Sequence, residues 1–172
     1  HMEEAMSGAR LKHYGWGREN EGMTAAEQAF VLGRYRAKFA RDAFETIAVP
    51  DLEHLTLRAP RVAPPASLAA FCSSERYDRV AHAYGKSYPD YVRAMLGDYD
   101  SAPDVVAYPR SEAEISAVMD WAGGVSAALT PFGGGSSVCG GVEPRVDGDS
   151  HKAAVTLDLR NLGRVVEVDQ IS

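Results

Sequence analysis

The fold can be worked out from one glycine-rich run: Pro131-Phe132-Gly133-Gly134-Gly135-Ser136-Ser137-Val138-Cys139-Gly140-Gly141. It holds five glycines and two serines within eleven residues, and it follows the apolar run Val125 to Leu129, which is typical of a buried strand. Glycine adopts positive φ without a Cβ penalty, so this loop can turn several N–H groups into one concavity that suits a phosphate. We therefore predict a phosphate-binding loop after a strand, with an ordinary flexible surface turn as the alternative.

Two common phosphate-binding motifs do not fit this loop. A Walker loop requires a Lys-Ser/Thr pair after its last glycine, and none is present. The dinucleotide pattern G-x-G-x-x-G fits at Gly133 and Gly135 but places Val138 where the third glycine belongs. Any anion in this loop must therefore be held by another geometry.

Length and composition indicate one globular core with accessory segments. The chain has 172 residues, 45% of them hydrophobic and 24% charged, and its formal net charge of −6 disfavours a nucleic-acid-binding surface. No apolar run approaches the roughly 20 residues that span a bilayer and no secretory signal is visible, so we expect a cytoplasmic protein, with peripheral membrane contact left open. Cys72 and Cys139 form no CxxC pair, which favours a reducing compartment, and His1-Met2 is typical of a tag remnant.

The N-terminal quarter of the chain indicates an arm followed by a helix. Residues 1–23 are polar and glycine-bearing, and we expect the motif LKHYGWG, residues 11–17, to dock on the body through its aromatic side chains. Thr24 and Glu27 form a T-x-x-E capping box, so a helix should begin there. Apolar residues recur at every fourth position of this helix, which predicts a single face made of Val31, Tyr35 and Phe39.

Residues 24–102 as a whole are predicted to be helical and extended. Four prolines between residues 47 and 68 predict an extended connector. Two short helices should follow. The first should be capped by Ser73 or Ser74, run to about Tyr84 and stop at Gly85. The second should have Pro89 in its first turn and end at Gly97. His82 lies near the break between them, where we expect a hydrogen-bonded structural histidine rather than a ligand or a base.

The last third of the chain predicts a β-α-β unit. Val105 to Tyr108 is a short β-rich run, and Ser111 with Glu114 forms a second capping box before a helix with a core-facing stripe. Gly123-Gly124 should end this helix, and Val125 to Leu129 should form the next strand. Two strands joined in this way should be parallel, with a right-handed crossover.

The rest of this region predicts a hairpin and the place of the ligand. Residues 154–159 and 164–168 both have strand patterns, and Asn161-Leu162-Gly163 should turn between them. Ligands of open α/β sheets bind beyond the carboxyl ends of the strands. The glycine-rich run follows such an end, which favours a functional loop over an idle turn.

These residues together resemble a known family. The segments PDVVAYPRSEAEISAVMDWA, PFGGGSSVCGG and VTLDLRNLGRVVEVD are similar to the first half of the FAD-binding domain of the vanillyl-alcohol-oxidase (PCMH-type) flavoproteins. Within that superfamily the chain most resembles the alkyl-dihydroxyacetonephosphate synthase (alkylglycerone-phosphate synthase) branch. LKHYGWG and the run Asp78-Arg79-Val80 leading to Ala83-Tyr84-Gly85 also resemble that branch, so the similarity covers nearly the whole chain from about residue 10.

The resemblance implies an α+β or α/β fold that is truncated. An N-terminal helical segment would be followed, over residues 103–172, by the first β-α-β-β lobe of a PCMH-type FAD-binding domain. Such enzymes carry more flavin contacts in a second lobe and their substrate pocket and acid/base residues in a cap domain. We therefore expect no catalytic residue and no metal site in this chain, which should be inactive by itself.

The resemblance also implies FAD as the cofactor. The stretch Pro131 to Ser137 would wrap the FAD diphosphate with backbone N–H groups, Ser136 or Ser137 would add a hydroxyl, and the residues up to Gly141 would continue along the cofactor. The loop contains no histidine of the kind that binds flavin covalently, which favours non-covalent FAD. The candidate cofactor-binding residues are therefore Pro131, Phe132, Gly133, Gly134, Gly135, Ser136, Ser137, Val138, Gly140 and Gly141.

Three functions stay open at this point. The resemblance implies ether-lipid synthesis by the parent enzyme, in which the acyl group of acyl-dihydroxyacetone phosphate is exchanged for a fatty alcohol. The pair Gly140-Gly141 is closer to hydroxy-acid dehydrogenases, so an FAD-linked oxidase or dehydrogenase of a 2-hydroxy acid is an alternative. A non-catalytic binding module is another, in which a partner or a second copy in a homodimer would cover an exposed apolar surface.

Overall fold

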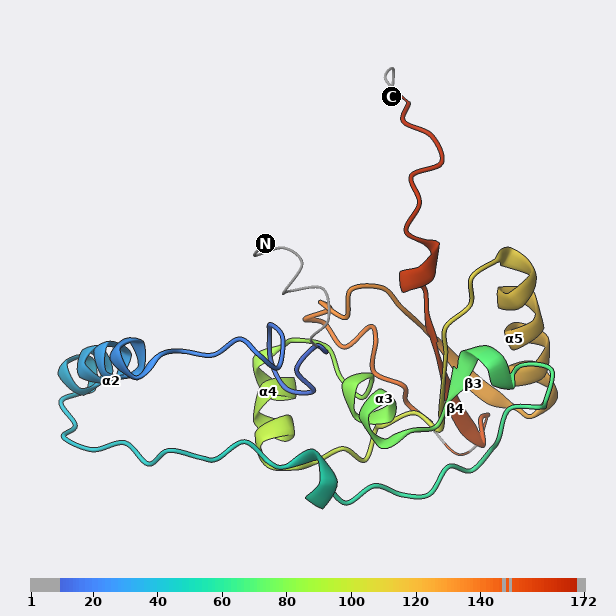
Figure 1. The fold of residues 1–172 in the computed structure, drawn as a ribbon. Coiled ribbons are helices and arrows are strands. Elements are labelled where there is room, and N and C mark those ends of the chain that lie inside the picture. The colour runs from blue at the N-terminus through green and yellow to red at the C-terminus, as the bar shows by residue number, and fades with distance from the viewer. Residues whose placement is uncertain (1–9, 147, 149, 170–172) are drawn as a thin grey trace.

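The computed structural model describes residues 10–146, 148 and 150–169, so the expected tag remnant His1-Met2 lies outside the described residues. The fold is mixed α and β, as the resemblance implies. A four-stranded sheet lies between helix α5, Glu112–Gly124, on one side and helices α3, Arg76–Ala81, and α4, Tyr88–Met95, on the other (Figure 1).

The sheet has the strand order β1-β2-β4-β3. Its strands are β1, Cys72–Ser73, β2, Val105–Ala107, β3, Ala127–Phe132, and β4, Ala153–Asp158. β4 pairs in parallel with both β2 and β3, whereas β1 pairs antiparallel with β2. The two strands of the β-α-β unit are therefore parallel, as predicted, but β4 lies between them. All of β4 is buried, as is usual for the central strand of a sheet covered on both faces.

The predicted hairpin is wrong. After β4 the chain enters a 3-10 turn at Arg160–Leu162, and residues 163–169 form no strand. β4 already has parallel neighbours on both of its edges, so the segment 164–168 has no free edge of β4 to pair with. Its valines, Val165, Val166 and Val168, are 74%, 84% and 73% exposed.

The helix α5 ends where predicted, whereas the strand β3 is shifted from its predicted limits. Ser111 caps α5 by accepting a hydrogen bond from the N–H of Glu114, and Val118 and Ala122 are buried as the stripe predicts. The helix ends at Gly124, so the prediction that Gly123-Gly124 end it is confirmed. β3 begins two residues later than expected and includes Pro131, which an edge strand tolerates because one side of its backbone needs no partner.

The two short helices exist but are capped differently from the prediction. Ser73 belongs to β1, and α3 begins after Glu75, which makes no side-chain capping bond. α3 ends at Ala81, earlier than expected, because the next residues turn into a core instead of continuing the helix. α4 begins at Tyr88, after the N-cap Ser87, which forms a capping box with Asp90, and it carries Pro89 in its first turn, as predicted.

Two apolar clusters hold the body together. The first lies between α5 and the sheet and centres on Val105, Val118 and Val155. The second lies among α3, α4 and the connector and includes Val80 and Tyr84. Within the aromatic motif of the arm, Tyr14 packs against the second cluster, whereas Trp16 is 61% exposed. The arm therefore docks as expected, but through one of its two large aromatic residues.

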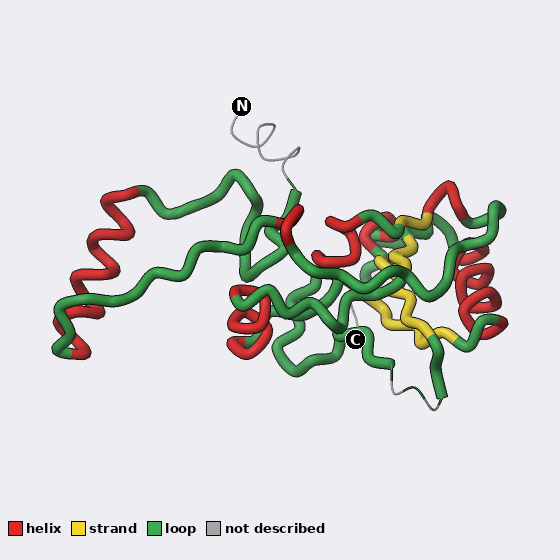
Figure 2. Tube along the Cα trace, turned by 90° about the horizontal axis from the view of Figure 1, so that it is seen from below, coloured by secondary structure: helices red, strands yellow, loops and turns green. Residues whose placement is uncertain are grey.

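Helix α2, Ala25–Phe39, stands apart from this body (Figures 1 and 2). Its predicted capping box is present, because Thr24 accepts from the N–H of Glu27 and Glu27 accepts from the N–H of Thr24. No residue of α2 is buried, so the predicted apolar face lies outside the core. Tyr35 and Phe39 stack on one another at a ring distance of 6.0 Å instead of entering a core.

Candidate functional site

The glycine-rich loop starts where β3 ends, and its three consecutive glycines are not equivalent. Gly133 and Gly134 are exposed, and a Cβ at either position would meet no atom within 4 Å. Gly135 is buried with φ of +66°, and its Cβ would lie 2.5 Å from the ring of Phe132. Only Gly135 therefore needs glycine for the fold, while Gly133 and Gly134 leave bare backbone facing open space.

The second half of the loop is closed by its own hydrogen bonds. The Ser137 hydroxyl accepts a bond of 3.1 Å from the N–H of Gly141 and lies 3.6 Å from the Cys139 sulfur. The contact with Ser137, together with backbone hydrogen bonding at Gly141, lowers the pKa of the exposed Cys139 thiol. Gly140 has φ of +79°, which permits this tight turn. Of the two serines expected to offer a hydroxyl, Ser137 is thus engaged within the loop, whereas Ser136 is exposed beside the open glycines.

The turn between α3 and α4 contacts the backbone of the glycine-rich loop at Ser137. The N–H of Lys86 donates a hydrogen bond of 2.6 Å to the carbonyl oxygen of Ser137. Gly85 packs so closely that a Cβ there would lie 2.1 Å from the same oxygen. From the sequence alone, this contact was missed. Its only signal was Gly85, which looks the same as a glycine that simply ends a helix.

A buried histidine holds the start of the loop. His82 is 1% exposed, and its ring centroid lies 4.3 Å from that of Phe132, the last residue of β3. One ring nitrogen lies 2.6 Å from the carbonyl oxygen of Asp78, and the other lies 2.8 Å from a carboxylate oxygen of Asp158. The prediction of a hydrogen-bonded structural histidine is therefore confirmed.

Asp158 joins this histidine to the end of the sheet. It is fully buried at the carboxyl end of β4, opposite Phe132 in the parallel register. Burial alone would raise the pKa of Asp158, but hydrogen bonds from His82 and Arg160 outweigh it and lower the pKa to about 2. A carboxylate that stays charged at this edge can accept all of these bonds at once, and it fixes the strand end from which the loop departs.

A second buried carboxylate lies at the opposite, amino end of the strands. Asp104 accepts hydrogen bonds from the N–H of Ala154 at 2.7 Å and from the N–H of Arg61 at 2.8 Å, and it pairs with the guanidinium groups of Arg58 and Arg61. Burial would raise the pKa of Asp104, but these hydrogen bonds lower it to about 2. This cluster ties the proline-rich connector to β2 and β4, and it is structural because it lies far from the loop along the strands.

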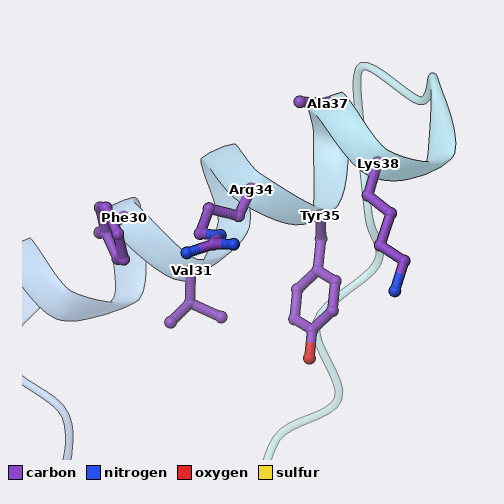
Figure 3. Close-up of a pocket in the computed structure, with 6 residues that line it drawn as sticks. All are labelled: Phe30, Val31, Arg34, Tyr35, Ala37 and Lys38. Atoms are coloured by element: carbon purple, nitrogen blue, oxygen red, sulfur yellow. The ribbon is translucent and has the colours of Figure 1, made fainter.

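Two hollows elsewhere do not compete with the loop as a site. One, of about 800 Å³, runs along α2, where Val31, Tyr35 and Lys38 point to the same side (Figure 3). Another, of about 560 Å³, is lined by arginines that already pair with Asp104 or Glu143. In the described part of the chain, no group of three or more His, Cys, Asp or Glu residues could hold a metal ion.

The loop leaves backbone open to a ligand at the carboxyl end of the sheet. Bare backbone lies open at Gly133 and Gly134, and β3, which leads to them, pairs in parallel with β4. Such carboxyl-end loops are where α/β sheets bind nucleotides, because backbone N–H groups there can converge on phosphate oxygens.

Among the described residues no helix is long and apolar enough to cross a membrane.

Comparison with known proteins then specifies the ligand. The family model of the FAD binding domain matches residues 103–172, from the segment before β2 to the end of the chain. Residues 103–172 are thus similar to the FAD binding domain family. The match includes β2, α5, β3, the glycine-rich loop and β4, and FAD is the cofactor of such domains.

Three curated relatives are alkyldihydroxyacetonephosphate synthases. The enzyme of Trypanosoma brucei brucei is 34% identical over 95 residues, that of Dictyostelium discoideum 30% over 96, and that of Caenorhabditis elegans 27% over 99. These matches include 55%, 56% and 57% of this chain. They span only 15% or 16% of the length of each relative.

Solved structures with the same name confirm the fold. Two crystal forms of alkyldihydroxyacetonephosphate synthase superpose with TM-scores of 0.74 and 0.75 at 22% sequence identity. The superposition includes 93% of this chain but only 34% and 33% of the solved chains. The helical segment therefore shares the architecture of that enzyme together with the FAD binding domain.

Proposed function

We propose that the glycine-rich loop binds the diphosphate of FAD, and that the chain is the N-terminal part of a flavoenzyme that resembles alkyldihydroxyacetonephosphate synthase. The open backbone of Gly133 and Gly134 at the end of β3 carries this proposal. Within the loop, Ser136 is the hydroxyl left free for a phosphate oxygen, while Phe132, Gly135 and Ser137 maintain the loop's shape. The remaining candidates, Pro131, Val138, Gly140 and Gly141, border the same ligand.

Bound FAD would supply a redox-active ring system that no side chain offers. The part of this chain is to bind the diphosphate and orient the cofactor. The loop holds no histidine, so we propose that FAD binds without a covalent bond. The chain is divided, on this proposal, into a docking arm at 1–23, a supporting region at 24–102 and the first FAD-binding lobe at 103–172.

The proposed reaction of the longer enzyme is the exchange of an acyl group for a fatty alcohol on dihydroxyacetone phosphate. The names of the curated relatives support this assignment. With only one side of the cofactor site and no catalytic residue assigned, the chain alone should bind FAD weakly and show no turnover. In a longer protein that contains the remaining domains, alkyl exchange without flavin reduction by lactate or glycolate supports the proposal. Flavin reduction by those hydroxy acids without alkyl exchange would contradict it.

Binding by the loop can be tested with the chain itself. FAD is titrated by flavin fluorescence, with ADP and riboflavin as competitors. Because the proposed contact is to the diphosphate, ADP should displace FAD and riboflavin should not. Gly134→Val should abolish binding without unfolding the chain, because its Cβ enters open space, and Gly124→Val in α5, where an added Cβ also meets no atom within 4 Å, is the matched control. Undetectable FAD binding, or full binding by Gly134→Val, would overturn the assignment.

A further inference from the structure

We propose that the turn between α3 and α4, residues 82–86, is a positioning element of the cofactor site, although it precedes the FAD binding domain in the chain. This inference rests on the proposed function of the loop. On this proposal the loop does not hold its binding shape by itself. The turn sets that shape from outside, through two anchors that lie on either side of the open glycines.

The first anchor holds the loop at Ser137, after the open glycines. The carbonyl oxygen of Ser137 accepts the Lys86 N–H at 2.6 Å, and Gly85 lies directly beneath it. A Cβ at Gly85 would lie 2.1 Å from this oxygen and 3.0 Å from its carbonyl carbon, so any other residue must displace the loop backbone. The contact joins main chain to main chain, and no side-chain rotation can relieve the clash.

The second anchor holds the start of the loop, at Phe132. The His82 ring packs on Phe132, and its position is fixed by hydrogen-bond partners on both of its nitrogens. Phe132 in turn fills the space beside Gly135, where a Cβ would be 2.5 Å from its ring. The backbone between the two anchors, from Gly133 to Ser136, is thus held at both ends while Gly133 and Gly134 stay open.

The turn can act in this way because it is itself rigid. Ala83 is completely buried, Tyr84 is 5% exposed, and the Tyr84 hydroxyl donates to the carbonyl of Asp98. On the other side of Gly85, the capping box between Ser87 and Asp90 fixes the start of α4. Both flanks of the turn are therefore anchored in the second apolar cluster or in α4, so a strained contact with the loop should move the loop first.

The positioning role can be tested with Gly85→Ala, compared with Gly124→Ala, which adds the same methyl group where no atom lies within 4 Å. Amide hydrogen exchange over residues 133–141 and FAD affinity are measured for both variants and for the unmodified chain. We expect faster loop exchange and FAD binding weakened about tenfold or more in Gly85→Ala, the scale of one lost hydrogen bond or more, and no change in Gly124→Ala. Unchanged loop exchange in folded Gly85→Ala would overturn the inference.

A second measurement covers the case in which Gly85→Ala does not fold. In the unmodified chain, FAD should slow amide exchange at Lys86 together with exchange at Gly133 to Ser136, because the loop and the turn form one unit. Slower exchange in the loop alone, with Lys86 unaffected, would overturn the positioning role and leave FAD binding by the loop intact. If the unmodified chain binds no FAD, the proposed function fails, but the exchange comparison of the two glycine variants still tests the anchors.

Discussion

Helices α5 and α2 begin with the same kind of signal and end in opposite environments. Ser111 caps α5 and Thr24 caps α2, and each helix has apolar residues at helical spacing. α5 buries Val118 and Ala122 against the sheet, whereas α2 buries no residue at all. Local sequence therefore determines that a helix forms, but whether its apolar face is buried depends on what the rest of the chain places beside it.

The body of the chain and helix α2 are stabilised by different kinds of contact. The body has two buried carboxylates, two apolar clusters and a sheet, and we expect these parts to unfold together. α2 has its capping box and a few aromatic contacts, and extended segments link it to the body (Figure 2). Changes in the body should thus alter the global free energy of unfolding, while changes in α2 should alter only local helix content.

The largest expected effect comes from Asp104→Asn in the body. The change leaves the guanidinium groups of Arg58 and Arg61 without their buried partner, which should cost about 3–5 kcal/mol in the free energy of unfolding. Urea denaturation measures the loss. Asp120→Asn, at an exposed position of α5, is the control and should change little. Equal effects of the two changes would mean that the buried cluster does not stabilise the body.

Acid should unfold the body through its two buried carboxylates. Folding lowers the pKa of Asp104 and of Asp158 to about 2, so each stabilises the fold above about pH 4. That contribution, about 2 kcal/mol for each group, should disappear as the pH falls from about 4 to about 2. Denaturation at stepwise lower pH should show this decline for the unmodified chain and a smaller one for Asp158→Asn. A flat profile over this range would contradict the assignment.

A matched pair of valines compares the two helices directly. Val118→Ala removes two methyl groups from the core beneath α5 and should cost about 2 kcal/mol. Val31→Ala makes the same change on α2, where no residue is buried, and should cost less than about 0.5 kcal/mol. Similar losses of free energy in both variants would show that α2 belongs to the cooperative body.

The smallest effect on the body is expected from Thr24→Ala, which should act on α2 alone. Loss of the N-cap should destabilise α2 by about 1 kcal/mol, because the N–H of Glu27 loses its acceptor. Amide exchange within residues 25–39 should become faster, while the denaturant midpoint of the body stays the same. A lower midpoint for the whole chain would show that α2 is coupled to the body.

Much of the fold could be predicted because its signals are local. The two caps, the proline-rich connector and the β-α-β pattern depend on neighbouring residues, and the structure contains them all. The hairpin failed because residues 164–168 have a strand pattern but no free edge, since β4 is paired on both sides. Such competition for an edge depends on contacts between distant segments, which no local pattern encodes.

The candidate site, like the fold, could be predicted only in part. The glycine-rich run pointed to the loop, but not to which glycine is open, because that depends on where Phe132 and the turn at Gly85 lie. Ser136 and Ser137 look equivalent in sequence, and only the hydrogen bond to Gly141 distinguishes them. The support from His82 and Lys86 is long-range and was missed for the same reason.

FAD binding by the unmodified chain and by Gly134→Val is the most direct test of the central claim. Flavin fluorescence during titration with FAD, followed by competition with ADP, reports whether the diphosphate lies at the open glycines. We predict saturable binding that ADP reverses, and no binding by a Gly134→Val variant that remains folded by circular dichroism. FAD binding that ADP does not reverse, or equal binding by the two chains, would contradict the claim that this loop holds the cofactor.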